Sequence, residues 1–208
     1  MQYPPVHHQE GNYKNIVQLM EMYPLATINS CMNNEMESTH TPLVYQPNNQ
    51  LGVLIGHIDK YNPQVDHFKE NIDVQIIFNG PQVYISPAIY STTQLPTWNY
   101  FKAHLKGKLT IENDREKVKQ SLINMTAFLE GDQPNYTLEP NNPRMEAALD
   151  YIVGFRIEIT SWEGKYKISQ DKKKEDQKRA MVAMQAAREN TKKEVALLYS
   201  AHETKKKR

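Results

Sequence analysis

The chain has 208 residues, with 25 Lys and Arg against 24 Asp and Glu, and a mean hydropathy of −0.71. This length suits one domain with a sizeable core plus an appendage. The single cysteine, Cys31, excludes an intramolecular disulfide framework and a multi-cysteine zinc or iron–sulfur site. It follows an apolar run, so we expect a buried strand cysteine. No stretch reaches the roughly 20 apolar residues of a membrane helix, so we expect no membrane partner. We also expect no signal peptide and a cytoplasmic location.

The charge is unevenly distributed along the chain. Residues 171–208 carry 12 Lys and Arg against 6 Asp and Glu, and the remaining residues carry 13 against 18. We therefore predict two parts, a domain over residues 1–170 and a basic amphipathic helix over 171–208. The predicted apolar stripe of that helix consists of Met181, Met184, Ala187, Val195 and Leu198.

The first half of the chain predicts mostly strands. A helix is expected over residues 12–22, ended by Pro24, followed by strands over 25–31, 38–45 and 51–57. Asn62 and Pro63 resemble the start of a helix that would run to residue 71. Two further strands, over residues 73–78 and 82–86, should be joined by a turn at 79–81, where the sequence reads Asn-Gly-Pro.

The second half alternates strands with capped helices. A long strand is expected over residues 100–111, bent or bulged near Gly107. Asn113 and Glu116 form a capping box for a helix whose apolar face consists of Val118, Leu122, Met125 and Leu129. Asn142 and Pro143 should open a short helix, followed by strands over 152–160 and 165–169 that are joined through residues 163–164.

This order of elements predicts an α+β, mainly β fold. Six to eight strands without a repeating β-α-β rhythm favour a small closed barrel with helical decoration over a doubly wound parallel sheet. The sequence contains no G-x-G-x-x-G motif and no Walker A loop, which disfavours a Rossmann or P-loop nucleotide site.

Four polar clusters within the strand-like segments, together with a segment before a late strand, contain six short motifs. The first two motifs, T/S-H-x-P-L and G-H-x-A-R-x-N-P, correspond to residues 39–43 and 56–63. The next two, F-x-G-P-x-x-Y-I-S-P and P-T-W-N-Y, correspond to 78–87 and 96–100. I-V-G and G-K-x-K-x-S-Q-N correspond to 152–154 and to the segment that starts at 164. With all six motifs in order over roughly residues 15–172, the chain resembles one family, the PaiB-type FMN-binding transcriptional regulators.

The resemblance implies an FMN-binding split barrel with FMN at the interface of a homodimer, and a role in gene regulation. It implies no catalytic residue and no metal ligand. The cofactor-binding residues that it implies, together with the chemistry of the side chains, are Ser38, Thr39, His40, Thr41, His57, Lys60, Asn62, Trp98, Asn99, Tyr100, Lys165, Lys167 and Gln170.

The physics of the corner between Lys60 and Asn62 agrees with this expectation. FMN ends in a dianionic phosphate, and a helix capped at Asn62 would present free backbone N–H groups and the positive end of its dipole. Lys60 would add a full charge. The alternative is a plain capped helix with a surface lysine. The family's Ala-Arg pair reads Asp59-Lys60 here, which keeps one cation, loses the guanidinium fork and adds a carboxylate.

The remaining predicted residues have equally specific alternatives. Thr39 and Thr41 share one strand face and could serve the phosphate or ribityl chain, or they could be ordinary strand threonines. The segment Trp98–Tyr100 suits the isoalloxazine ring, or Trp98 could be a core residue. Ile89 stands where the family has a tryptophan. Lys165, Lys167 and Gln170 could reach the phosphate or the ring.

Three functions remain open at this point. The first is an FMN-binding module with a regulatory or redox-sensing role. The second is a flavin-dependent NAD(P)H reductase or oxidase, in which the chemistry would be the flavin's own. The third is a regulator that binds DNA directly through residues 172–208, whose basic runs could contact nucleic acid nonspecifically. We favour a helix that packs on a partner subunit over a nucleic-acid contact, since no helix-turn-helix or zinc-finger pattern is present.

Overall fold

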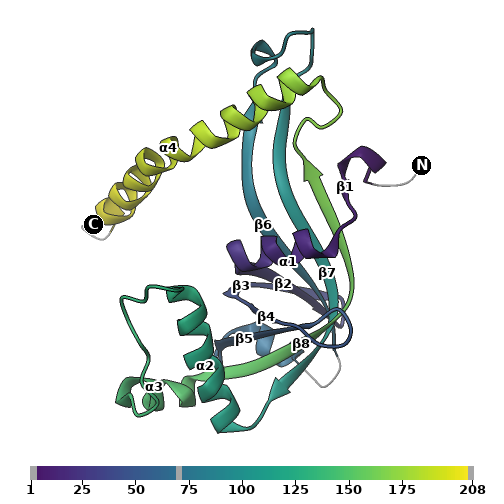
Figure 1. Ribbon diagram of the computed structural model, residues 1–208. Coiled ribbons are helices and arrows are strands. Elements are labelled where there is room, and N and C mark those ends of the chain that lie inside the picture. The colour runs from purple at the N-terminus through teal and green to yellow at the C-terminus, as the bar shows by residue number, and fades with distance from the viewer. Residues whose placement is uncertain (1–3, 69–71, 206–208) are drawn as a thin grey trace. The chain divides into compact units, whose positions relative to one another are not determined.

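The computed structural model describes residues 4–68 and 72–205 (Figure 1). Its α-helices are α1 (Tyr13–Met22), α2 (Arg115–Glu130), α3 (Pro143–Ala148) and α4 (Lys174–Lys205). Its short 3-10 helices are η1 (Val6–His8), η2 (Pro63–His67), η3 (Pro87–Ile89) and η4 (Leu149–Tyr151). Its strands are β1 (Gln9–Glu10), β2 (Leu25–Met32), β3 (Glu35–Pro42), β4 (Val44–Gln46), β5 (Val53–Asp59), β6 (Ile72–Ile85), β7 (Thr97–Glu112) and β8 (Ile152–Lys167).

The strands form a sheet that closes on itself. Its order is β3-β2-β6-β7-β8-β5-β4, with β1 paired to β8. The path begins at β3 and ends at β4, and only Leu43 separates these two strands in the chain. One bent segment therefore joins the two ends of the sheet, which confirms the predicted split barrel.

Strand alternation fills the interior of the barrel. On β2, the side chains of Ala26, Ile28 and Ser30 are buried, whereas Cys31 is exposed. The prediction of a buried cysteine is therefore wrong. The period of two sends Cys31 to the face opposite Ser30, so the apolar run before it does not decide its burial.

Gly56 marks a point of close packing inside the barrel. It pairs with Phe155 across β5 and β8. A Cβ atom on Gly56 would lie 2.6 Å from Leu43 Cδ2 and 2.8 Å from Phe155 Cζ. The buried ring of Phe155 also meets Phe68 edge to face, with 5.3 Å between the ring centroids. The bend at Leu43 thus packs directly against the centre of the core.

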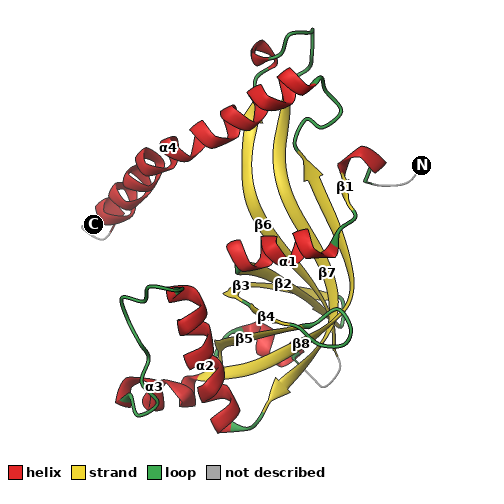
Figure 2. Cartoon of the chain, viewed as in Figure 1, coloured by secondary structure: helices red, strands yellow, loops and turns green. Residues whose placement is uncertain are grey.

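Two predicted turns lie instead inside continuous strands, as Figure 2 shows for β6 and β8. In β6, the alternate residues Val74, Ile76, Phe78 and Gly80 are all buried. This alternation runs through the expected Asn-Gly-Pro turn, because pairing within the sheet outweighs local turn preference. In β8, Gly164 leaves room for α1, since a Cβ atom there would lie 2.6 Å from Ile16 Cδ1.

The helix predictions need three corrections. The helix expected to begin at Asn62 is the five-residue 3-10 helix η2, and residues 69–71 of the expected helix lie outside the described residues. The N-cap of α2 is Asp114, whose carboxylate accepts from the backbone N–H groups of Glu116 and Lys117. Asn113 is therefore not the cap. On the face predicted for α2, Val118 and Met125 are buried, whereas Leu129 is exposed.

The apolar contact of α4 differs from the predicted stripe. Ala180, Ala183 and Met184 pack against Ile85 and Tyr90. Met181 and Val195 are exposed instead. The side chain of Leu198 lies outside the described residues.

The chain divides into two compact units. The barrel unit comprises Glu10–Asn79 and Lys102–Gly164, and the terminal unit comprises Met1–Gln9, Gly80–Phe101 and Lys165–Arg208. The predicted boundary between residues 170 and 171 remains a prediction. Among the described helices, none combines the length and the apolar character needed to cross a membrane.

The close packing at Gly56 predicts a large effect of a single methyl group. Gly56→Ala should lower the free energy of unfolding by about 1–3 kcal/mol, because the new Cβ atom overlaps Leu43 and Phe155. Gly11→Ala is the matched control, since nothing lies within 4 Å of a Cβ atom there, and it should change stability by less than about 0.5 kcal/mol. Urea unfolding of both variants measures the difference. Equal stabilities would contradict the packing described here.

The hydrogen bonds between Asp176 and Ser91 attach α4 to its unit, and we expect their contribution to stability to depend on pH. Its buried carboxylate accepts from the Ser91 backbone N–H at 2.8 Å and from the Ser91 hydroxyl at 3.0 Å. The bond from the Ser91 backbone, followed by that from its hydroxyl and by the charge of Arg179, lowers the pKa of Asp176. A lowered folded-state pKa stabilises the folded protein above the unfolded value of about 3.9 and loses this effect as pH falls through the folded value.

Asp176→Asn should therefore be less stable than the unsubstituted protein at pH 7, and the difference should shrink below about pH 4. Urea unfolding at pH 7 and pH 3 measures it. Ser91→Ala, which removes the hydroxyl and keeps the backbone bond, should show a smaller difference at pH 7. A difference that is the same at both pH values would overturn the assignment of the pH dependence to this carboxylate.

Candidate functional site

The four polar residues predicted on β3 are divided between two faces of the strand. Ser38 donates to Asn29 Oδ1 at 2.7 Å, and His40 Nδ1 lies 2.9 Å from the Thr27 hydroxyl. Both contacts are cross-strand pairs with β2 and are exposed. Thr39 and the buried Thr41 belong to the opposite face. Neighbouring residues of this cluster therefore present different surfaces.

Thr39 and Asn62 form a corner between β3 and η2. Asn62 Nδ2 donates to Thr39 Oγ1 at 2.9 Å, while Asn62 Oδ1 accepts the Gln64 N–H. Because a hydroxyl group can accept and donate at once, Thr39 keeps its own hydrogen for a further acceptor. Thr41 differs, since it donates to the His57 carbonyl at 2.9 Å. Thr39 is thus the threonine with a donor left over.

Lys60 lies next to this corner in the sequence and supplies its positive charge. Its ammonium donates to the Asp150 carbonyl at 2.6 Å and lies 5.6 Å from the ring centroids of Tyr61 and Tyr151. An ammonium group has three N–H donors, so this bond, the one that Lys60 makes to the described part of the chain, leaves the group able to bind an anion. The Asp59 carboxylate accepts the Tyr61 N–H at 2.8 Å. In the described ranges it makes no bond to Lys60.

The backbone groups of the corner differ from the expectation of free N–H donors. Tyr61 N–H donates to the Asp59 side chain, Asn62 N–H to the Asp59 carbonyl, and Gln64 N–H to the Asn62 side chain. Pro63 has no N–H. A single 3-10 turn also contributes little dipole. The backbone anion site is therefore wrong as predicted, and the donors of the corner are side chains.

Two buried polar residues hold η2 in place, and sequence patterns did not indicate them. Gln64 is fully buried, and its Nε2 lies 3.0–3.1 Å from Ser30 Oγ and from the carbonyl oxygens of Ile28 and Glu37. His67 Nδ1 lies 3.0 Å from the same Ser30 hydroxyl. These bonds fix η2 against β2 and β3. The orientation of Asn62 therefore depends on residues inside the barrel.

His57 is the most distinctive predicted residue of the barrel unit. Its Nδ1 is buried and has no hydrogen-bond partner in residues 4–68 and 72–205. Burial lowers the pKa of this imidazole below its ordinary value. The ring is consequently neutral at pH 7, and one nitrogen is left to pair with an added polar group.

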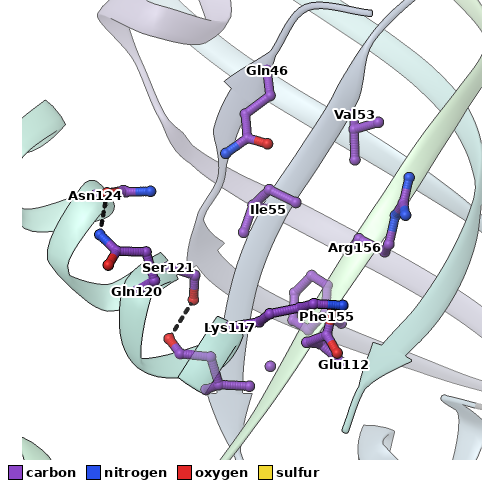
Figure 3. Close-up of a pocket in the computed structure, with 12 residues that line it drawn as sticks. Gln46, Val53, Ile55, Glu112, Lys117, Gln120, Ser121, Asn124, Phe155 and Arg156 are labelled. Carbon is purple, nitrogen blue, oxygen red and sulfur yellow. Dashed lines mark hydrogen bonds and ion pairs between the residues drawn. The ribbon is translucent and has the colours of Figure 1, made fainter. Parts of the chain in front are cut away.

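One cavity of the barrel unit is lined by none of the predicted cofactor residues. It has a volume of about 400 Å³ and lies between α2 and the strands β4, β5 and β8 (Figure 3). We call it the α2 cavity. The sequence motifs gave no indication of it, because its lining comes from residues outside the six matched segments, apart from Gly154.

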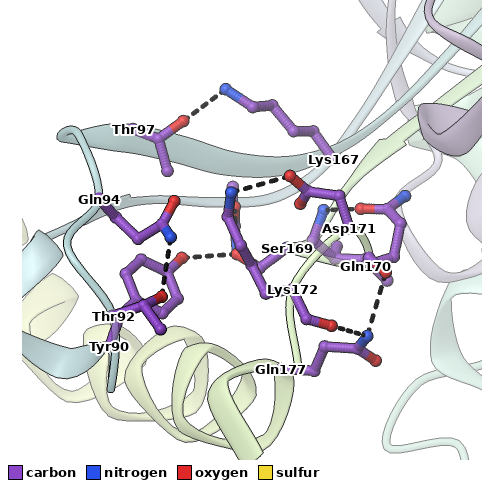
Figure 4. Close-up of polar contacts among 12 residues, drawn as sticks. Tyr90, Thr92, Gln94, Thr97, Lys167, Ser169, Gln170, Asp171, Lys172 and Gln177 are labelled. Carbon is purple, nitrogen blue, oxygen red and sulfur yellow. Dashed lines mark hydrogen bonds and ion pairs between the residues drawn. The ribbon is translucent and has the colours of Figure 1, made fainter. Parts of the chain in front are cut away.

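The terminal unit holds the second group of predicted residues around a buried hydroxyl network (Figure 4). The Tyr90 hydroxyl lies 2.7 Å from Ser169 Oγ, and Asn99 Nδ2 donates to the same oxygen at 3.0 Å. Ser169 adopts a φ of 65°, which is uncommon for a residue with a side chain. Asn99 therefore holds the chain at Ser169 in its left-handed conformation.

The neighbours of Asn99 point the other way along β7. Trp98 is 53% exposed, and Tyr100 stacks with Lys165, whose Nζ lies 5.6 Å from its ring centroid. Gln170 bonds within its own turn, accepting the Ile168 N–H at 2.8 Å and donating to the Tyr166 carbonyl. The alternation of β7 thus places Trp98 and Asn99 on opposite faces.

Lys167 and Asn99 line a cavity of about 270 Å³ within the terminal unit. Lys167 donates to the Thr97 hydroxyl, which lines the same cavity together with Tyr90 and Ser169. Tyr90 was absent from the predicted set, although it lies three residues after the matched Y-I-S-P motif. The predicted residues therefore fall into two groups, 38–62 in the barrel unit and 98–170 in the terminal unit.

The comparisons with known proteins agree with this fold and these motifs. A family model described as "Putative FMN-binding domain" matches residues 2–161. The "Protease synthase and sporulation protein PAI 2" of Bacillus subtilis (strain 168) is 29% identical over 176 residues, which are 84% of each chain.

Two solved structures have the same fold. The FAD and heme binding protein from Mycobacterium smegmatis superposes with a TM-score of 0.62 at 14% identity, covering 81% of this chain and 78% of the other. The flavocytochrome Anf3 from Azotobacter vinelandii superposes with a TM-score of 0.60 at 15% identity, covering 81% and 74%.

The side chains of the corner suit the cofactor of this family. The unused O–H of Thr39, the ammonium of Lys60 and the second N–H of Asn62 are donors for an anionic phosphate. The unpartnered nitrogen of His57 is a further polar group for a ligand. From the family match over residues 2–161, the chain belongs to the family of FMN-binding domains, and the prediction of FMN as its cofactor is confirmed.

Proposed function

We propose that this FMN-binding flavoprotein is a regulatory module that holds the FMN phosphate at the corner formed by Thr39, Lys60 and Asn62. The observation that carries this proposal is the set of unused donors at that corner. Within residues 4–68 and 72–205, Thr39 accepts one hydrogen bond and keeps its own hydrogen, and the exposed Lys60 ammonium makes a single bond, to a carbonyl.

Each residue of the corner has a separate task in this proposal. Lys60 balances part of the phosphate charge, Thr39 donates to a phosphate oxygen, and Asn62 fixes the hydroxyl that does so. His57 offers a neutral nitrogen, so it orients polar groups of the ligand without adding charge. FMN, when bound, supplies the redox chemistry of its isoalloxazine ring.

The regulatory role is supported by the nature of the Bacillus relative. The name of that protein refers to protease synthesis and sporulation, which are cellular programmes rather than a reaction on one substrate. A redox-sensing module would use the oxidation state of the flavin to change the protein's interactions. A homodimer with FMN at its interface, as well as a cytoplasmic location, belongs to the same proposal.

The basic segment from residue 172 supports a protein contact better than a nucleic-acid contact. The first turns of α4 pack against Ile85 and Tyr90, and Arg179 donates to the Ile89 carbonyl at 3.1 Å. A helix with such contacts is anchored to its own unit at one end. We propose that its remaining part packs on the partner subunit. Nonspecific contact between residues 172–208 and nucleic acid stays the alternative.

The corner predicts which side chains set the affinity for FMN. Thr39→Val and Lys60→Met should each weaken FMN binding by about ten- to a hundredfold, because each removes a bond to a charged group, worth about 1.5–3 kcal/mol. Quenching of flavin fluorescence on binding measures the dissociation constants. Lys106→Met, which removes an exposed cation from β7, is the control and should leave the affinity unchanged. Unchanged FMN affinity in both corner variants would contradict this placement of the phosphate.

The proposed dimer predicts the mass of the FMN-loaded protein. Light scattering should give twice the chain mass of 24.2 kDa over a wide range of concentrations. A particle with the mass of one chain that binds FMN with undiminished affinity would contradict a shared interface.

Electrophoretic mobility of random duplex DNA, measured at low salt with the same preparation, tests the alternative role of residues 172–208.

A further inference from the structure

The α2 cavity is a second concave site of the barrel unit. Its volume of about 400 Å³ lies within the range of small-molecule sites, about 300–1,000 Å³. Apolar side chains from three elements face it, including Val53 and Ile55 of β5 and Val118 of α2. Figure 3 shows these strands on one side and the polar residues of α2 on the other. The cavity therefore combines an apolar floor with a polar wall.

Contacts at the N-terminal end of α2 keep this cavity open. A Cβ atom on Gly154 would lie 2.6 Å from Val118 Cγ2, so helix and strand are already in direct contact at that point. Arg115 bonds to Asp150 at 2.6 Å, and Lys119 pairs with Glu146. At this end the helix thus contacts β8, α3 and η4.

The polar wall has unused hydrogen-bonding groups. Ser121 donates to the Val118 carbonyl at 2.7 Å, which leaves its oxygen free to accept. Gln120 Nε2 donates to Asn124 Oδ1 at 2.8 Å, which leaves the Asn124 amino group as a donor. The Gln46 amide has no bond to any residue that the structure describes. A ligand would therefore meet both donors and acceptors.

Two cations line the cavity, and neither is firmly paired. Lys117 Nζ lies 3.8 Å from Glu112, and Arg156 lies 2.8 Å from Glu158. Ion pairs this exposed to solvent contribute only about 0–1 kcal/mol each. Both cations can therefore exchange their partners for an anion in the cavity. The planar guanidinium of Arg156 matches the two oxygens of a carboxylate.

We propose that the α2 cavity binds a small aromatic carboxylate. Its ring would lie on the apolar floor at Ile55 and Val118, and its carboxylate would face Arg156 and Lys117. This site is separate from the corner of Thr39 and Asn62 and is independent of the function proposed for that corner. It gives the protein a ligand besides FMN.

The test uses 1-naphthoate and its neutral analogue 1-naphthamide as probes, with calorimetry on the full chain loaded with FMN. We expect saturable binding of 1-naphthoate with one site per chain. Ser121→Trp fills the cavity and should abolish this binding, whereas Leu129→Trp adds the same ring at an exposed position of α2 and should leave it intact. FMN affinity should be unchanged in both variants, which separates this site from the proposed flavin corner.

Arg156→Met tests the chemical class of the ligand without filling the cavity. Its side chain is exposed, so the fold is retained even where Ser121→Trp fails to fold. It should weaken 1-naphthoate by roughly tenfold or more and change 1-naphthamide less than about twofold. Absence of saturable 1-naphthoate binding, unchanged binding in Ser121→Trp, or equal losses for both probes in Arg156→Met would each overturn the proposal.

Discussion

The bend at Leu43 is the constraint on which the barrel depends. A sheet that begins at β3 and ends at β4 can close only if the chain turns sharply between these strands. Leu43 is buried at that turn, and Gly56 lets it pack against the strand that carries Phe155. Because β3 and the end of β5 are brought together by the same closure, Thr41 reaches the His57 carbonyl and Thr39 reaches Asn62.

The corner is maintained by polar groups that are costly to bury. An unpaired buried amide or imidazole costs about 1–3 kcal/mol. The Gln64 amino group lies near three acceptors, whereas its Oε1 has no partner among the described residues. His57 leaves one buried nitrogen without a partner in the described part of the chain. Such an unsatisfied group is a candidate contact for a polar ligand. The ion pairs of the α2 cavity are exposed to solvent, so their charged groups can also bind a ligand but cost less than a buried group when they are left unpaired.

Sequence patterns predicted local features such as helix caps better than they predicted the lengths of the strands. Asn142 caps α3 as expected, since capping depends on a few neighbouring atoms. The Asn-Gly-Pro segment near Gly80 and the glycine at 164 are typical of turns, but the turns predicted there do not form. Both lie inside strands whose pairing partners are distant in sequence, and such pairing overrides a turn preference of about 1 kcal/mol. Asp114 replaced Asn113 as a cap because neighbouring cap candidates differ by only a few tenths of a kcal/mol.

The sequence by itself determined the family, the order of the motifs and FMN as the cofactor, because ordered motifs carry that information without coordinates. Only the tertiary structure decided which face each motif residue occupies. Ser38 and His40 point away from Thr39, and Asn99 serves a buried hydroxyl network. Burial and hydrogen-bond partners arise from segments far apart in the chain, so no local pattern records them. The α2 cavity has the same origin, since α2 and β5 meet only in the folded barrel unit.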